Sequence, residues 1–296
     1  MIGLDWGTTS LRAYRLDQAG AVLEKRESKS GILSVKPGGF PDELCKIAGD
    51  WLDAGETLVV IAGMAGSKQG WAEAPYLACP ATVTDIARAT LPVPFPATRV
   101  RLVPGLKAQD ADGVPEVMRG EETQILGILD HLPEQEVTLC LPGSHSKWVR
   151  VQAGRILGFS THMTGEVFAA LSAHTILARS LHRGAPHHAG AFARGLARAR
   201  QGGGLLHQLF GLRSLSLFDA MPELEAASYL SGLLIGHEVA AALEAGVAPP
   251  VHLIGAAALT QRYSAALAAF GIPSQVEAED AAAAGLFRIG AEIMAS

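Results

Sequence analysis

Apolar and polar positions follow the same layout in two separate stretches of the chain. Each stretch begins with an apolar run, passes through a turn with glycine and hydroxyl residues, and ends in two alternating segments joined by a second turn. The first stretch predicts strands at Ile2–Asp5, Leu11–Leu16 and Val22–Glu27, and the second at Val137–Leu141, Lys147–Val151 and Ile156–Thr161. The two stretches share little sequence identity, so the repeat is one of layout.

Helical periodicity follows each of these stretches. Leu44, Ile47, Ala48 and Trp51 recur at the spacing of one buried helix face, and Asp42 is the expected N-cap. Further helices are predicted at Glu121–Leu132, from Glu166, at Glu223–Ala245 and at Ala257–Phe270, and further strands at Leu58–Ala62, Val100–Val103 and Val251–Ile254. Residues 184–204, rich in glycine and histidine, are expected to form loops.

Strands that alternate with helices in both halves indicate the α/β class. The repeat predicts two lobes, residues 1–134 and 135–296, whose two glycine turns face each other across a central cleft. The apolar stretch at Leu230–Ala242 is interrupted by His237 and Glu238, so it is interpreted as a core helix and not a membrane span.

Composition excludes several classes of partner. The 296 residues carry a formal net charge of -5 and no basic run, so a nucleic-acid or anionic-membrane partner is not expected. The three cysteines are far apart and show neither metal spacing nor a disulfide pattern, which favours buried free thiols in a reducing cytoplasm. The first residues predict a strand and show no basic start or apolar signal region, so a secretion signal is not expected.

The two glycine turns are candidate phosphate sites. A glycine turn lets backbone amides approach an anion, and Thr8, Thr9 and Ser144 add hydroxyl donors. Asp5 suits a hydrated Mg²⁺, and Lys147 brings a positive charge to the second turn. Positioned phosphates, a metal and a cation are the parts that phosphoryl transfer needs. The alternative for the first turn is an ordinary strand turn with a capping aspartate.

A second candidate group is the segment Arg119-Gly-Glu-Glu122. Glu121 or Glu122 could serve as the general base for a substrate hydroxyl, although acidic residues in a first helical turn are commonly explained by the helix dipole. Adjacent residues point in different directions, so at most one should face a substrate. Arg119 would pair with that carboxylate or with an anionic substrate.

Other motifs are absent or have two interpretations. The chain contains no G-x-x-x-x-G-K-[ST] motif, and no G-x-G-x-x-G lies between a strand and a helix. His145 could contact a phosphate or be a satisfied turn residue. Thr164 and Glu166 could form a capping box or line the cleft.

Eight blocks carry a resemblance to a known family. DWGTTSLRAY, GMAGSKQGWAEAPY, PGLK, VMRGEETQILG, LPGSHSKWV, MTGE, YLSGLLIGHEVA and LIGAAALTQRY occur in this order, and the whole chain resembles the 2-dehydro-3-deoxygalactonokinases. That family belongs to the group of acetate and sugar kinases, Hsp70 and actin. MRGEETQ and PGSHSKW are the distinctive blocks, whereas D-x-G-T-T is shared across the group.

The resemblance implies an ATP- and Mg²⁺-dependent kinase that phosphorylates the 6-hydroxyl of 2-dehydro-3-deoxy-D-galactonate in D-galactonate catabolism. It also implies two ribonuclease-H-like lobes around a central cleft. Asp5 would hold Mg²⁺ through water, and Glu121 would be the base, with Glu122 second and Asp110 or Asp112 as alternatives. Phosphates would be bound by Gly7, Thr8, Thr9, Gly143, Ser144, His145 and Lys147, adenosine by Gly255, Ala256 and Leu259, and the sugar acid by Ser30, Gly31, Met64, Gly66, Ser67, Trp71 and Arg119.

The chain departs from the family pattern at two points. Ser144 stands where threonine is expected, and the base of related sugar kinases is usually an aspartate. Two alternatives stay open: a kinase of the same fold for another sugar acid, such as 2-dehydro-3-deoxy-D-gluconate, and a nucleotide-gated binding protein of the actin or Hsp70 type. A cytoplasmic location is expected, and a homodimer is one option for the quaternary structure.

Overall fold

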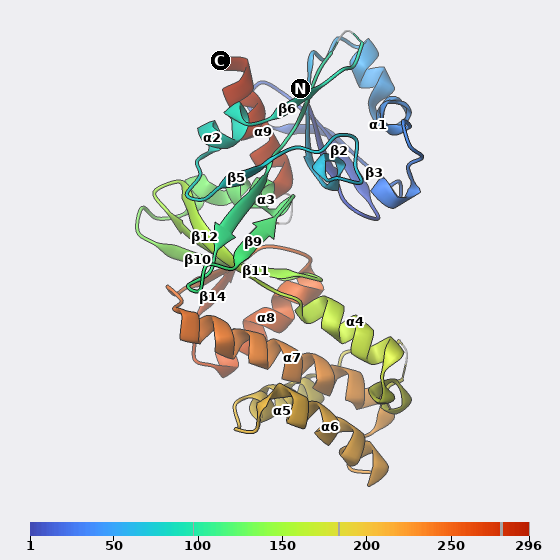
Figure 1. Cartoon of the computed structure of the whole chain (residues 1–296), viewed down its shortest axis with the longest axis vertical. Coiled ribbons are helices and arrows are strands. Elements are labelled where there is room, and N and C mark those ends of the chain that lie inside the picture. Colours follow the sequence, from blue (N-terminus) through green and yellow to red (C-terminus); the bar gives the residue numbers. More distant parts are fainter. Residues whose placement is uncertain (97, 183, 279–280, 296) are drawn as a thin grey trace. The chain divides into compact units, whose positions relative to one another are not determined.

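Two sheets with matching strand order form the framework of the protein (Figure 1). A computed structural model describes residues 1–96, 98–182, 184–278 and 281–295. The chain divides into two compact units: unit 1 contains Met1–Glu136, Val149–Ser160 and Ala278–Ser296, and unit 2 contains Val137–Trp148 and Thr161–Glu277.

The sheet of unit 1 has six strands in the order β3-β2-β1-β4-β7-β6. β1 pairs antiparallel with β2 and parallel with β4, and β4 pairs parallel with β7. The strands are β1 (Ile2–Trp6), β2 (Leu11–Leu16), β3 (Val22–Ser28), β4 (Leu58–Gly63), β6 (Leu91–Val93) and β7 (Arg99–Leu102). All six residues of β4 are buried, because a central parallel strand is covered on both faces.

The second sheet has the order β12-β11-β10-β13-β14, which repeats the first five positions of the unit 1 sheet. Its strands are β10 (Val137–Leu141), β11 (Ser146–Gln152), β12 (Arg155–His162), β13 (Val251–Leu253) and β14 (Ser274–Val276). β10 and β13 are parallel, as β1 and β4 are. The repeat of layout predicted from the apolar pattern is therefore confirmed as a repeat of topology.

A small third sheet, β5-β8-β9, belongs to unit 1 and was not predicted. It consists of β5 (Tyr76–Ala78), β8 (Gly105–Gln109) and β9 (Pro115–Met118). β9 ends directly before Arg119 and α3 (Glu121–Ile128), so this sheet holds the segment that carries the candidate base.

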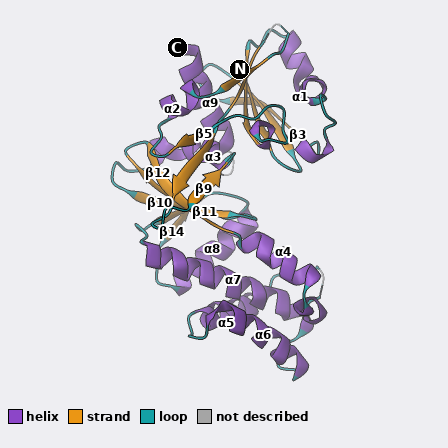
Figure 2. Ribbon diagram, in the orientation of Figure 1, coloured by secondary structure: helices purple, strands orange, loops and turns teal. Residues whose placement is uncertain are grey.

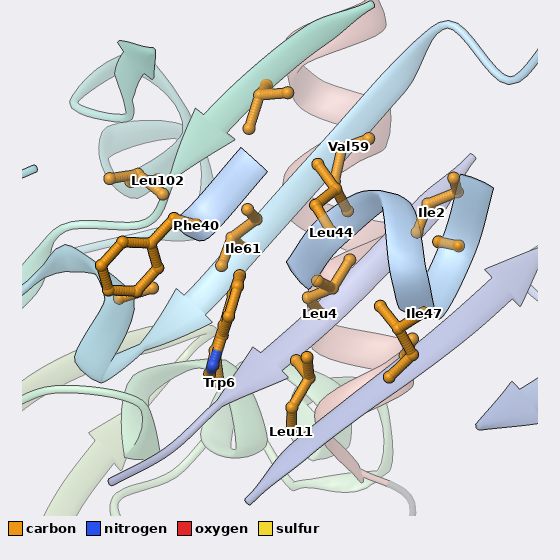
Figure 3. Packing of buried hydrophobic residues seen from close by; sticks show 14 of the residues in the cluster. Ile2, Leu4, Trp6, Leu11, Phe40, Leu44, Ile47, Val59, Ile61 and Leu102 are labelled. Carbon is orange, nitrogen blue, oxygen red and sulfur yellow. The ribbon is translucent and has the colours of Figure 1, made fainter. Parts of the chain in front are cut away.

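The core of unit 1 lies between its large sheet and helix α1 (Phe40–Asp53). Figure 3 shows side chains of β1 and β4, among them Leu4 and Ile61, beside Leu44 and Ile47 of α1. Gly39, and not Asp42, is the N-cap of α1, because the helix begins at Phe40 with Pro41 in its first turn.

The last helix, α9 (Ala281–Ala295), lies in unit 1 beside α2 (Val83–Arg88) and α3 (Figure 1). Two glycines allow α3 and α9 to approach closely. A Cβ on Gly127 would lie 1.8 Å from the Ala281 carbonyl oxygen, and one on Gly285 would lie 1.8 Å from the Thr123 carbonyl oxygen.

Unit 2 contains α4 (Thr164–His174), α5 (Ala189–Ala199), α6 (Gly204–Leu217), α7 (Glu223–Ala245) and α8 (Ala257–Ala269). Figure 2 shows α5, α6 and α7 packed together without strands between them. The expectation of loops at residues 184–204 is therefore wrong, since α5 occupies most of that range. Gly195 of α5 and Gly232 of α7 lie at the contact between these two helices, where a Cβ would meet backbone 2.2 Å and 2.1 Å away.

Helix α7 is long and apolar enough to cross a membrane by length and composition alone. However, 72% of its apolar window is buried inside the protein, as expected for the predicted core helix. Cys140 is buried, Cys79 is half-buried and Cys45 is exposed, so the expectation of buried thiols is wrong for Cys45.

Candidate functional site

The first glycine turn follows β1 and is held by a neighbouring segment of unit 1. Its Gly7 N–H donates to the Ser10 carbonyl at 2.9 Å. Backbone N–H groups of Ile32 and Leu33 donate to the carbonyls of Gly7 and Thr8 at 3.1 and 3.3 Å. The side chains of Thr8 and Thr9 remain exposed, so their hydroxyls are accessible.

Ser30 and Gly31 lie against this same turn. The Trp6 indole N–H donates to the Ser30 carbonyl at 2.8 Å. A Cβ on Gly31 would lie 2.3 Å from backbone atoms of Thr9, so only glycine allows this approach. The structure thus brings together two segments that the sequence assigned separately to phosphate and to sugar acid.

Asp5, near the end of β1, has the chemistry that a hydrated magnesium ion needs. Its side chain is 21% exposed, and the guanidinium of Arg12 lies 3.7 Å away. Burial raises the pKa of Asp5, while the charge of Arg12 lowers it. Among the described residues no hydrogen-bond donor contacts the carboxylate, so its oxygens are open to a ligand. No group of three or more histidine, cysteine or acidic residues with metal-site geometry occurs in the part of the chain that the structure describes.

The carboxyl ends of β1 and β4 meet the start of α3. Trp6 pairs with Gly63, which has a φ of 87°, a region that favours glycine. A Cβ on Gly63 would lie 2.7 Å from the Trp6 carbonyl oxygen, and one on Gly120 would lie 3.3 Å from the Gly63 Cα. The N-terminus of α3 is therefore placed at the edge of the sheet that also carries Asp5.

Glu121 and Glu122 point in different directions from this helix start. Glu122 is fully buried, and its carboxylate accepts hydrogen bonds from the Gly120 N–H at 2.7 Å and the Thr123 hydroxyl at 3.3 Å. Burial, together with the neighbouring charge of Glu121, raises the pKa of Glu122 to about 8. Glu121 is half-buried and accepts a hydrogen bond of 3.0 Å from the Arg119 N–H. Of the two carboxylates, only that of Glu121 is accessible to a substrate.

The guanidinium of Arg119 is incompletely paired. Nη2 donates to the Ala74 carbonyl at 2.8 Å, and the guanidinium carbon lies 4.4 Å from the centre of the Tyr76 ring. Nε and Nη1 are buried and have no hydrogen-bond partner among the described residues. Buried donors without partners cost free energy, so such a pair indicates a place for an acceptor that binds.

The loop from Met64 to Trp71 supplies another buried donor beside Arg119. A Cβ on Gly66 would lie 2.9 Å from Nη1 of Arg119, so the loop touches the guanidinium. The buried Ser67 hydroxyl that follows also has no partner among the described residues. These donors share the chemistry that binds a carboxylate.

Trp71 is placed differently from the other predicted sugar-acid residues. It stacks on Phe40 at 6.1 Å and meets Phe95 edge-on at 6.4 Å, and Trp6 lies on the other side of Phe40. Together with Met64 it packs against the unit 1 core. Many of the contacts of Trp71 and Met64 are therefore hydrophobic contacts with the core of unit 1.

Asp110 and Asp112, the alternative bases, lie in the turn between β8 and β9. The Asp110 carboxylate accepts hydrogen bonds from the backbone N–H groups of Asp112 and Val114 at 3.0 and 2.8 Å. Both aspartates are exposed. The role visible in the structure is therefore that of turn residues.

The second glycine turn follows β10 in unit 2. The Gly143 N–H donates to the Ser146 hydroxyl at 3.4 Å, where the first turn uses the Ser10 carbonyl. Ser144 and His145 are exposed at the outside of the turn, and Lys147 is 4% exposed. The Lys147 ammonium donates to the Thr161 hydroxyl at 2.8 Å.

The start of α4 packs directly on this turn. The Glu166 N–H donates to the Ser144 carbonyl at 3.0 Å, and the Glu166 carboxylate pairs with the His145 ring. Glu166 thus contacts the turn, and α4 begins without a side-chain cap, so the capping-box interpretation is wrong. Thr161 and Glu166 are polar contacts of the turn that the sequence analysis did not assign to it.

Gly255 lies beside the second turn at the carboxyl end of β13. It has a φ of 145°, and a Cβ there would lie 3.7 Å from the Pro142 carbonyl oxygen. Ala256 and Leu259 follow at the start of α8, where the Leu259 N–H donates to the Ala256 carbonyl at 2.9 Å. The structure therefore brings the predicted adenosine turn next to the predicted phosphate turn.

Unit 2 also contains a cavity of about 480 Å³. Its lining comes from α4, α7, α8 and the segment before α5, and includes Phe168, Ser228, Ser231 and Arg262. Of helix α8 the lining includes Arg262, and none of the predicted adenosine residues Gly255, Ala256 and Leu259 belongs to it.

Comparisons with known proteins agree along the whole chain. A family model described as 2-keto-3-deoxy-galactonokinase matches residues 5–289. A protein of Rhizobium meliloti (strain 1021) described as a probable 2-dehydro-3-deoxygalactonokinase is 38% identical over 288 residues, which is 96% of this chain and 94% of the relative. The 2-dehydro-3-deoxygalactonokinase of Escherichia coli (strain K12) is 35% identical over 282 residues, 95% of this chain and 94% of that protein.

A crystal structure from Sinorhizobium meliloti whose description carries the same enzyme name has a TM-score of 0.91 with this chain. It is 37% identical and covers 99% of this chain and 98% of that chain. The similarity, together with the two sheets of matching order, confirms the predicted α/β fold of the sugar kinase, Hsp70 and actin type.

Proposed function

Because the chain belongs to the 2-keto-3-deoxy-galactonokinase family, we propose that it transfers the γ-phosphoryl group of ATP to the 6-hydroxyl of 2-dehydro-3-deoxy-D-galactonate. As a member of this family the chain is a carbohydrate kinase that uses ATP. The sugar acid and the position of transfer are the parts that we propose.

The observation that carries the proposal is the set of buried donors without partners in unit 1. Nε and Nη1 of Arg119 and the hydroxyl of Ser67 are available to a carboxylate, the group that distinguishes a sugar acid from a neutral sugar. A guanidinium donates charge-assisted hydrogen bonds to a carboxylate, and the Tyr76 ring lies against the guanidinium of Arg119. An acid substrate would therefore satisfy donors that a neutral sugar leaves unpaired.

Glu121 is the base in this proposal. Its position at the sheet edge, with partial exposure, allows it to accept the proton of a substrate hydroxyl as the new bond to phosphorus forms. Glu122 keeps a structural role at the start of α3, where its buried carboxyl accepts the Gly120 N–H.

Asp5 is the residue that would hold Mg²⁺, because its carboxylate oxygens are open and oxygen is the ligand that this ion prefers. When bound, the ion neutralises charge on the transferring phosphate. Gly7, Thr8 and Thr9 of unit 1 and Gly143, Ser144, His145 and Lys147 of unit 2 would bind phosphate oxygens. Gly255, Ala256 and Leu259 would contact adenosine.

We also propose that the enzyme is a cytoplasmic homodimer. The argument for a second copy comes from α6, which is apolar on two faces: Leu209 and Leu212 are buried, whereas Leu206, Phe210 and Leu217 are more than half exposed. Phe218, which is 83% exposed, directly follows this helix and adds a further exposed apolar side chain. Exposed apolar side chains gathered on one helix are typical of protein–protein interfaces, and a second copy of this chain is the partner that we propose.

The dimer is tested by the mass in solution of the wild-type protein and of Phe210→Glu with Phe218→Glu. A dimer that becomes a monomer on substitution supports the second copy. A wild-type monomer at concentrations well above those of the assay overturns it.

The proposed reaction is tested by the release of ADP from ATP and Mg²⁺ with different acceptors. Purified protein is offered 2-dehydro-3-deoxygalactonate, its gluconate epimer, galactonate, galactose and no sugar in parallel. Fast turnover with the first acceptor alone supports the proposal. Faster turnover of the gluconate epimer would change the substrate, and slow hydrolysis independent of sugar would favour a nucleotide-gated binding protein.

A further inference from the structure

A buried chain of hydrogen bonds leads from the second glycine turn into the interior of unit 2. The Gly143 N–H donates to the Ser146 hydroxyl at 3.4 Å, and the Ser146 hydroxyl lies 2.8 Å from that of Tyr263 on α8. The Tyr263 hydroxyl in turn lies 2.7 Å from a carboxylate oxygen of Glu238 on α7. The other carboxylate oxygen of Glu238 accepts from the Trp148 indole at 2.8 Å.

The direction of every bond in this chain follows from counting protons. Indole N–H only donates and a carboxylate only accepts, so Trp148 and Tyr263 both donate to Glu238. A phenol has a single proton, and therefore the Ser146 hydroxyl must donate to Tyr263. The serine oxygen is then free to accept the Gly143 N–H. Burial and the nearby charge of Glu238 raise the pKa of Tyr263, so the phenol keeps the proton on which this order depends.

The ordered chain fixes one side of the turn. Ser146 is fully buried and is the first residue of β11, so its hydroxyl anchors the point where the turn becomes a strand. The other side is held by Glu166, which donates its N–H to the Ser144 carbonyl. Between these anchors, Ser144 and His145 are exposed and able to meet a ligand.

A buried carboxylate is costly unless its bonds are all made, and Glu238 is only 4% exposed. An apolar residue at this position would avoid that cost, and the hydrophobic surroundings of α7 would accommodate it. We therefore look for a role of the Glu238 carboxylate other than stability. Its hydrogen bonds lead through Tyr263 and Ser146 to the proposed phosphate turn.

We propose that Glu238 and Tyr263 are positioning residues for the nucleotide phosphates, acting through Ser146 on the turn Gly143–Lys147. This inference rests on the proposed function of that turn. It assigns no contact with substrate to either residue. Their effect is to hold the turn amides in the geometry that receives phosphate before ATP arrives, which reduces the ordering cost of binding.

The test compares three single substitutions in the full-length protein. Tyr263→Phe removes one link of the chain, and Ser146→Ala removes the anchor. Ser146→Thr keeps a hydroxyl at a strand position that favours threonine, and serves as the conservative rescue. Thr138→Val is the matched control, because it too removes a buried hydroxyl. That hydroxyl accepts the Ala248 N–H and lies on β10, at the end of the strand opposite the turn.

The readouts are the KM for ATP and for the sugar acid, and the affinity for ADP measured by calorimetry. Tyr263→Phe and Ser146→Ala are expected to raise the KM for ATP and the Kd for ADP about 5- to 10-fold, with the KM for the acceptor unchanged. Ser146→Thr should retain most of the affinity. Thr138→Val should lower thermal stability without moving either nucleotide constant.

Two results would overturn the inference, and they are distinguishable. If the wild type binds ADP and Tyr263→Phe binds it equally well, the chain has no positioning role, whatever the turnover number shows. If the wild type binds no nucleotide at all, the proposed function itself fails and the inference fails with it.

Discussion

The guanidinium carbon of Arg119 lies 4.4 Å from the centre of the Tyr76 ring, and Nη2 donates to the carbonyl of Ala74. These two contacts hold the fork of the side chain in a fixed plane while Nε and Nη1 stay without partners among the described residues. A cation held this way is preorganised for a planar anion. The position of one arginine thus links the small third sheet to the proposed carboxylate site.

Arg119→Lys is expected to reduce kcat/KM for the sugar acid by about 100-fold, because lysine keeps the charge but not the planar guanidinium and its fixed donors. Steady-state kinetics with the sugar acid varied at saturating ATP measures the effect. Tyr76→Leu, which removes the ring but not the donors, is the matched variant and should cost less. An Arg119→Lys enzyme with unchanged kinetics would remove this residue from carboxylate recognition.

Asp5→Asn is expected to abolish phosphoryl transfer and to leave the fold intact, since an amide of the same shape replaces the carboxylate that would hold Mg²⁺. Turnover and circular dichroism together check this. Asp53→Asn, an exposed position at the end of α1, is the control for loss of one negative charge. Near-normal turnover of Asp5→Asn would remove Asp5 from the metal role.

Glu121→Gln is expected to lower kcat by roughly 100-fold or more, because the glutamine cannot accept the substrate proton. Glu122→Gln should have a much smaller effect on kcat, since that side chain is fully buried and contacts only protein. Both variants are compared by kcat at one pH. The reverse order of effects would move the base to Glu122.

The raised pKa of Glu122 predicts a particular dependence of stability on pH. The carboxyl has a pKa of about 8 when folded and near 4.5 when unfolded, so the native state binds more protons between these values. Its contribution is therefore fully present at low pH and is lost as the pH rises through about 8. Urea unfolding should show a decrease in the free energy of unfolding of about 3 kcal/mol from about pH 5.5 to about pH 8.5.

Glu122→Gln is the control for this decrease, because the amide has no charge to bury and its oxygen can still accept the Gly120 N–H. Its free energy of unfolding should vary much less over the same pH range. Parallel curves for the two proteins would contradict the assignment.

Two glycines of unit 2, Gly195 at the α5–α7 contact and Gly211 in α6, are predicted to respond in opposite ways to replacement by alanine. Gly195→Ala places a Cβ 2.2 Å from the Tyr229 carbonyl oxygen, and backbone cannot yield easily, so a loss of about 1–3 kcal/mol is expected. Gly211→Ala in α6 meets open space and should stabilise by about 0.5–1 kcal/mol. Chemical unfolding of both variants measures the difference, and equal destabilisation would mean that helix propensity is not what limits α6.

The strands of the two large sheets that form hairpins or buried runs were predictable, because their pattern depends on near neighbours, whereas the small β5-β8-β9 sheet was missed. Both hairpins and the buried strand at Leu58–Gly63 have apolar runs and glycine turns that a single window of sequence contains. The helix α5 was missed for the opposite reason. Its glycines indicate flexibility when considered alone. Gly195 instead allows a close contact with Tyr229 of α7, which lies more than thirty residues later in the sequence.

The same distinction applies to the candidate site. The sequence singled out the two glycine turns, Asp5 and the two glutamates as candidate site residues, and it left Asp110 and Asp112 as alternative bases. The sequence could not reveal which of the two glutamates is buried, because that depends on how α3 packs against α9. Tyr76, Thr161 and the Tyr263–Glu238 pair carry no local signal, since each acts through a partner that is distant in sequence.

The place of α9 has a consequence for synthesis on the ribosome. Unit 1 needs residues Ala278–Ser296, and the helix that carries the two glutamates packs on α9 through paired glycines. A chain emerging from the ribosome therefore lacks one wall of its first unit until α9 has been made. The helix that carries the proposed base would acquire its native support only then, so a chain truncated before α9 is expected to be inactive.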